Sequence, residues 1–176
     1  MSITEWIIKW LMEWCSVWSK DVVIPNFYVG QWEMDVFKMT WTWYIMEYEV
    51  KISRADFKND FKKWDKHKLL KNWELHTNRF FYVVPEWLIK LEEVPDYCGL
   101  IYAKEYEGAP WRYHFKVIQK AKLLHKNNLS SDIDFIKKLL HKVVFRESIK
   151  TMKLNNLKRE NKRLKNAYIK LKNWNI

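Results

Sequence analysis

The sequence predicts a mixed α/β sandwich, in which helices flank a central sheet and a basic helix follows at the C-terminus. Three patterns lead to this fold class. An apolar stripe with a helical period opens the chain, β-branched and aromatic runs of strand length follow it, and a second helical pattern separates these runs from further ones. Strands, a helix, strands and then a helix are the element order of an α/β domain.

The first helix is expected to begin at Ser2. Ser2-Ile3-Thr4-Glu5 matches a capping box, in which Ser2 caps the helix and Glu5 reaches back to it. An apolar stripe at helical spacing follows, comprising Ile3, Ile7, Trp10, Trp14 and Val17. The tryptophans of this stretch would also suit a surface for nucleic-acid bases, but such a stripe is typical of a helix packed on a sheet.

Strand-like runs form two groups. β-branched and aromatic residues favour strands, and the first group comprises residues 22–24, 27–29, 32–37 and 43–52. The short connection near residues 38–42 predicts an antiparallel hairpin. In the second group, residues 79–84 form an uninterrupted apolar run that is typical of a central strand. Further strands are expected over 97–103 and, at the sheet edge, over 112–118.

A helix is expected between the two groups of strands. Ser53-Arg54-Ala55-Asp56 is a second capping box, and the helix that it opens should run to about Lys71. One or two helical turns are expected over 86–91, and a further helix over 132–145.

Most of the net charge of +11 lies at the C-terminus. Residues 150–176 hold nine Lys and Arg residues against Glu160, so they carry +8 and leave +3 for residues 1–149. We therefore expect a globular domain over 1–149 and a basic helical tail over 150–176. Polyanions are the natural partners of such a tail, nucleic acid before membrane.

The tail repeats every seven residues. Leu157, Leu164 and Leu171 are spaced by seven, and the alternate positions of the seam are Leu154, Asn161 and Tyr168. Three interpretations remain open: a short parallel coiled coil that makes a homodimer, a single basic helix along a nucleic-acid backbone, and a tail that orders on meeting its partner. In the second, the DNA-binding residues are Lys158, Arg159, Lys162 and Arg163.

The two cysteines, Cys15 and Cys98, have no partner at metal-binding or redox spacing, which indicates a reducing compartment. Charged residues interrupt the first apolar stripe, so no signal peptide is visible. No apolar run approaches the ~20 residues that cross a bilayer. We expect a cytoplasmic protein, in a bacterial or phage-infected host cell, without a membrane partner.

Charged residues on two neighbouring strands form the candidate site. Alternation along a strand puts Glu47, Glu49 and Lys51 on one face, and it does the same for Glu33 and Asp35 on the preceding strand. The hairpin can bring Asp35 close to Glu49. Carboxylates suit Mg²⁺ or Mn²⁺, and such an ion neutralises phosphate charge and activates water in phosphodiester hydrolysis. We expect Asp35 and Glu49 to bind the metal, with Glu33 and Glu47 as further candidates.

Lys51 and the basic helix extend this hypothesis to DNA. Lys51 can orient the attacking water and help to deprotonate it, or stabilise the pentavalent phosphate. The helix that follows carries the expected contacts to the DNA backbone, namely Lys58, Lys62, Lys63, Lys66 and His67. A solvated helix face would explain the same lysines.

An acid followed by Glu-x-Lys on a neighbouring strand resembles the pattern of the PD-(D/E)XK nuclease superfamily. Residues 25–126 resemble an uncharacterised phage and bacterial branch of it, and more distantly MmcB-type DNA repair proteins; the matching segments are WEMD, EYEVKISRADFKNDFKKWDKHKLL, NRFFYVVPEWLI, VPDYCGLIYA and KVIQKAKLLHK.

The resemblance implies a restriction-endonuclease-like fold and a role for three residues. Asp35 matches the first metal-binding acid, Glu49 the second, and Lys51 the catalytic lysine, although Met34 stands where the motif has proline. The expected function is a metal-dependent DNA endonuclease of repair, restriction or phage genome processing. A non-cleaving DNA-binding protein of the same fold and a structural domain with a charged sheet face are the alternatives.

Overall fold

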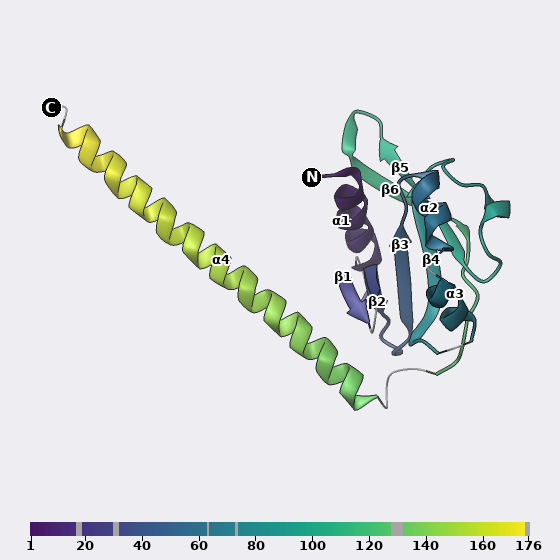
Figure 1. Ribbon diagram of the computed structural model, residues 1–176. Helices are drawn as coiled ribbons and strands as arrows, with labels where there is room; N and C mark the ends of the chain where they lie inside the picture. Colours follow the sequence, from purple (N-terminus) through teal and green to yellow (C-terminus); the bar gives the residue numbers. More distant parts are fainter. Residues whose placement is uncertain (17–18, 30–31, 63, 73, 128–131, 175–176) are drawn as a thin grey trace. The chain divides into compact units, whose positions relative to one another are not determined.

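The structure, a computed structural model, describes residues 1–16, 19–29, 32–62, 64–72, 74–127 and 132–174. Six strands of the first part of the chain make one mixed sheet in the order β1 to β6 (Figure 1). Their bounds are β1 (Val22–Val29), β2 (Trp32–Met39), β3 (Ile45–Val50), β4 (Thr77–Pro85), β5 (Gly99–Tyr106) and β6 (Ala109–Gln119). Strand β4 pairs in parallel with β3 and β5, and the other neighbours are antiparallel.

This sheet confirms the expected fold class, an α/β fold with a mixed sheet and a C-terminal helix. It also confirms the hairpin, which is β2 with β3, and the central position of the apolar run, which is β4. The last strand, β6, lies at the sheet edge as expected.

Helices cover both faces of the sheet. One face packs on α1 (Ile3–Ser16), and its buried core includes Ile7, Leu11, Val36, Tyr48 and Val83. The other face lies towards α2 (Arg54–Asp60) and α3 (Trp64–Lys71), and its core includes Phe57, Leu70, Phe80 and Tyr82. Because side chains alternate along a strand, Glu47 and Glu49, the neighbours of Tyr48, point towards α2 and α3.

Three elements differ from the expectation. Strand β1 continues through Pro25 and Asn26, where Asn26 has a φ of 47°; an edge strand accepts proline because it needs fewer donors. The helix expected from Ser53 to Lys71 is two helices, since α2 ends at Asp60. The turns expected over 86–91 are replaced by a turn and the 3₁₀ helix η1 (Leu91–Glu93). The first helical stripe extends to residues 17 and 18, which lie outside the described residues.

The second unit is one helix, α4 (Ile133–Trp174). The chain divides into Met1–Ser130 and Ser131–Ile176, earlier than the expected boundary at 149/150. Helix α4 takes in both the helix expected over 132–145 and the basic tail, and its 42 residues contain no glycine or proline that would break it. Among the described residues, no helix combines the length and the apolar character that crossing a membrane requires.

Candidate active site

Asp35 and Glu49 lie directly beyond the last pair of the β2–β3 hairpin. Val36 pairs with Tyr48 in this hairpin. This pair is the last of the ladder, and Asp35 and Glu49 follow it on the face that lies towards α2 and α3. Asp35 Oδ2 also accepts a hydrogen bond from the backbone N–H of Val50, at 2.7 Å. The hairpin thus brings the two carboxylates together as its alternation predicts.

Lys51 joins this pair at the end of β3. Its Nζ lies 2.8 Å from Glu49 Oε1, 3.2 Å from Asp60 Oδ1 and 3.6 Å from Asp56 Oδ1. Its backbone N–H donates to Val83 O of β4 at 3.0 Å, which holds the residue against the central strand. The lysine side chain is buried, so Glu49 and Asp60 hold it in place from two sides.

Lys66 occupies the centre of the charged cluster. Its Nζ lies 2.7 Å from Glu47 Oε1 and 2.8 Å from Glu49 Oε2, and it lies 4.8 Å from the centre of the Phe80 ring. Lys66 is only 5% exposed, and Glu47 is fully buried. Lys66 therefore does not lie on a solvated helix face, and its expected contact with DNA stays a prediction. Its ammonium group instead neutralises two buried carboxylates.

Asp60 is the residue of the site that the sequence analysis missed. It is fully buried, and Tyr82 donates a hydrogen bond to its Oδ2 at 2.7 Å. His67 Nε2 lies 3.1 Å from the same oxygen, and His67 Nδ1 lies 2.7 Å from the Tyr97 hydroxyl. His67 is thus also part of a largely buried network, and its expected contact with the DNA backbone stays a prediction.

The position of Asp60 follows from the geometry of α2. Ser53 caps this helix, and its hydroxyl accepts a hydrogen bond from the Asp56 N–H at 3.1 Å, as the capping box predicts. Asp60 stands three residues after the buried Phe57, and residues at that spacing share one side of a helix. An acid on the apolar side of a helix was therefore the signal in the sequence.

Burial and charge shift the acidities of the site. Burial, and then the charge of Glu49, raises the pKa of Asp35 to about 7. Burial alone would lower the pKa of Lys51, but Glu49, Asp60 and Asp56 raise it above its ordinary value. Burial alone would raise the pKa of Asp60, but His67, the two lysines and Tyr82 hold it well below its usual range. Lys51 therefore keeps its positive charge at neutral pH.

The charge balance of the cluster favours a cation. It holds five carboxylates and two ammonium groups, namely Asp35, Glu47, Glu49, Asp56 and Asp60 with Lys51 and Lys66. Mg²⁺ usually takes one or two protein carboxylates and keeps several waters, and Asp35 with Glu49 meets that need. In the described ranges, no three His, Cys, Asp or Glu side chains are grouped to hold a metal ion. An ion here would rely on two carboxylates and water.

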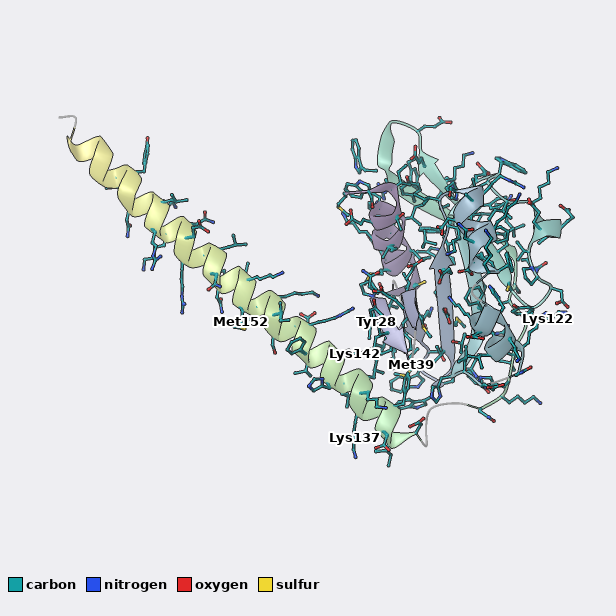
Figure 2. All side chains as sticks on the ribbon, viewed as in Figure 1. Tyr28, Met39, Lys122, Lys137, Lys142 and Met152 are labelled. Atoms are coloured by element: carbon teal, nitrogen blue, oxygen red, sulfur yellow. The ribbon has the colours of Figure 1, made fainter. Side chains whose placement is uncertain are left out.

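The remaining candidates lie elsewhere or remain predictions. Glu33 is exposed, and its hydrogen bond raises the pKa of Tyr28, labelled in Figure 2. Lys58 and Lys62 are exposed on or beside α2, whereas Lys63 lies outside the described residues. The four candidates of the tail are exposed on α4, namely Lys158, Arg159, Lys162 and Arg163.

Comparison with known proteins supports the fold alone. No family model matches the sequence, and no curated protein sequence matches it. A solved structure, the SPO1766 protein of unknown function from Silicibacter pomeroyi, is similar with a TM-score of 0.53 and 23% sequence identity. The similarity covers 72% of this chain and 76% of that chain. At this identity it indicates a shared fold and says nothing about activity.

Proposed function

We propose that this protein is a metal-dependent deoxyribonuclease of the PD-(D/E)XK type, with Asp35, Glu49 and Lys51 as its catalytic residues. The observation that carries the proposal is the proximity of Asp35 and Glu49 at the end of the hairpin, where the charge of Glu49 contributes to the raised pKa of Asp35, with Lys51 bound to Glu49. An acid and a Glu-x-Lys pair on neighbouring strands are the arrangement that the sequence resemblance implies. The net negative charge of the cluster supports the same proposal.

The residues of the cluster would have different roles in the reaction. Asp35 and Glu49 would hold Mg²⁺ or Mn²⁺, which supplies charge neutralisation at the phosphate and a more acidic bound water. Lys51 is held by Glu49 and Asp60 and keeps its proton, so it stabilises negative charge on the phosphate and does not act as the base. Lys66 neutralises the negative charge of Glu47 and contacts Oε2 of Glu49.

One observation favours the alternative, a DNA-binding protein of the same fold that does not cut. Both carboxylate oxygens of Glu49 already contact an ammonium group, Oε1 that of Lys51 and Oε2 that of Lys66. A metal ion would have to share these oxygens. Without an ion, the cluster would serve as a charged core beneath a DNA-binding surface.

Cleavage assays separate the two functions. We expect nicking or cutting of supercoiled, linear or single-stranded DNA with Mg²⁺ or Mn²⁺ and none with EDTA. Glu49→Gln and Lys51→Met should each lower the rate by about 100-fold or more, because each removes a charge that the transition state needs. Glu33→Gln, which removes an exposed carboxylate from the same face of β2, is the matched control and should cut normally. Cutting that survives both Glu49→Gln and Lys51→Met would reject the site.

Binding that persists without cutting would support the alternative function. In that outcome the wild type binds DNA in a salt-dependent manner but leaves every substrate intact with either metal ion. The carboxylate variants would then change stability without changing any reaction.

The basic residues of α4 lead to a separate prediction about the salt dependence of DNA binding. Replacing both Lys158 and Lys162 with glutamine should weaken DNA binding and reduce the slope of log K against log salt by about two, since each neutralised phosphate contributes ~0.9. Lys116→Gln with Lys120→Gln removes two exposed charges from the first unit and serves as the control. Equal slopes for the two double variants would show that α4 does not contact the DNA backbone.

A further inference from the structure

The continuity of α4 extends its apolar seam. The sequence shows heptads over residues 154–171, and because α4 is one helix, the same register continues back to Ile133. Twelve seam positions result, and nine of them are apolar: Ile133, Ile136, Leu140, Val143, Leu154, Leu157, Leu164, Tyr168 and Leu171. Six heptads exceed the three to four that indicate a coiled coil.

The seam lies open along the helix. Six of its apolar side chains are more than half exposed, namely Ile133, Leu140, Leu154, Leu157, Leu164 and Tyr168. An exposed seam that is apolar at nine of twelve positions marks a contact surface. The expected DNA-binding residues of α4 all lie outside seam positions, namely Lys158, Arg159, Lys162 and Arg163. One helix can therefore carry both the apolar seam and the basic surface.

The polar seam positions indicate what covers it. Glu147 and Lys150 form one charged layer near the centre of the seam, and Asn161 lies near one end. In a parallel pair of helices Glu147 would face Glu147 and Lys150 would face Lys150. In an antiparallel pair centred on this layer, each Glu147 faces the Lys150 of the other helix.

The same antiparallel register matches the apolar positions between Ile133 and Leu164, while Tyr168 and Leu171 extend beyond the overlap. It sets Leu140 against Leu157, Val143 against Leu154, and Ile133 beyond them against Leu164. Asn161 is the polar position that faces an apolar residue, Ile136. It lies near the end of the overlap, where its amide can reach water. A parallel pair would satisfy Asn161 but would set Glu147 against Glu147 and Lys150 against Lys150. The ion pair of Lys150 Nζ with Glu147 Oε1 of the same helix, at 2.6 Å, offsets only part of that repulsion.

We infer that α4 pairs with the α4 of a second copy in an antiparallel coiled coil. The self-complementary seam is the reason for choosing a second copy as the partner, because the Glu147–Lys150 layer pairs with its own reverse. This inference does not rest on the proposed nuclease activity.

Mass measurement of the full chain tests the pairing. The wild type should sediment as a dimer, and Leu157→Asp should weaken dimerisation by about 100-fold, since it places a charge in the seam. Met152→Asp is the matched control, because Met152, labelled in Figure 2, is 66% exposed and lies off the seam. A monomeric wild type, or a Leu157→Asp dimer as tight as the Met152→Asp dimer, would overturn the inference.

Disulfide trapping tests the orientation and requires no destabilising variant. Leu140→Cys mixed with Leu157→Cys should give a cross-linked dimer on mild oxidation, while each variant alone should not. The two natural cysteines are buried and unpaired, so the parent chain gives the background. Cross-linking of Leu157→Cys with itself would instead show a parallel pair, because antiparallel copies hold those two positions 17 residues, about 25 Å, apart.

Discussion

Asp35→Asn is expected to abolish cleavage and at the same time to stabilise the protein at pH 8. The folded protein raises the pKa of Asp35 from 3.8 to about 7, chiefly through burial. Asparagine is neutral, has nearly the same shape, and still offers an oxygen to the Val50 N–H. The variant therefore keeps the hairpin contact without the buried charge.

The sign of this effect follows from proton linkage. A carboxyl group whose pKa is raised by folding stabilises the folded state at low pH, and this stabilisation is lost as the pH rises towards 7. At pH 8 the ionised Asp35 should cost on the order of 2–4 kcal/mol. Urea unfolding at pH 5, 6, 7 and 8 should show a free energy of unfolding for Asp35→Asn that exceeds the wild type increasingly with pH.

Glu33→Gln is the control for Asp35→Asn, since it removes an exposed carboxylate from the same strand. Its unfolding free energy should follow the wild type at every pH. If Asp35→Asn is less stable than the wild type at pH 8, the buried position of this carboxylate contributes stability and the linkage argument fails.

Lys66→Met is expected to lower the free energy of unfolding by about 3–5 kcal/mol at neutral pH, because it leaves Glu47 and Glu49 buried without their shared cation. The loss should shrink as the pH falls and these carboxylates take up protons. Chemical denaturation gives the magnitude, and Lys58→Met, an exposed lysine of α2, is the matched control.

A double variant isolates the pair. Adding Glu47→Gln to Lys66→Met removes the buried carboxylate that has lost its cation. The double variant should therefore recover part of the lost free energy of unfolding, so the two changes are not additive. A Lys66→Met protein that is as stable as the wild type but binds DNA more weakly would restore the surface role that the sequence suggested.

The alternation of residues is what made the centre of the site predictable. Glu47, Glu49 and Lys51 share a face because strand side chains alternate strictly, and the hairpin length brings Asp35 near Glu49. Neither feature depends on how side chains pack, so both could be predicted from the sequence.

The break between α2 and α3 is what sequence reasoning lacked. On an unbroken helix Lys66 would lie nine residues beyond Phe57, half a turn away from the buried side and therefore in solvent. The structure ends α2 at Asp60 and restarts at Trp64, which turns Lys66 inwards to Glu47. No glycine or proline marks the break in the sequence, so tertiary packing decides it.

The length of α4 was hidden for a related reason. Glu147 and Lys150 interrupt the apolar pattern, so the sequence reads as a helix ending near 145 and a separate tail. Charged residues do not interrupt a helix, however, and the backbone runs on without a cap or a turn.

The parallel pairing of β3 with β4 has a consequence for protein synthesis. Parallel strands need a long crossover, and here the crossover is the α2–α3 segment that carries Asp60 and Lys66. Thr77 and Tyr82, which bind two of the acids, belong to β4 itself. A nascent chain on the ribosome therefore holds every charge of the cluster before it can assemble them. The pairing of β4 with β3 would therefore be the folding step that brings the charges of the cluster together.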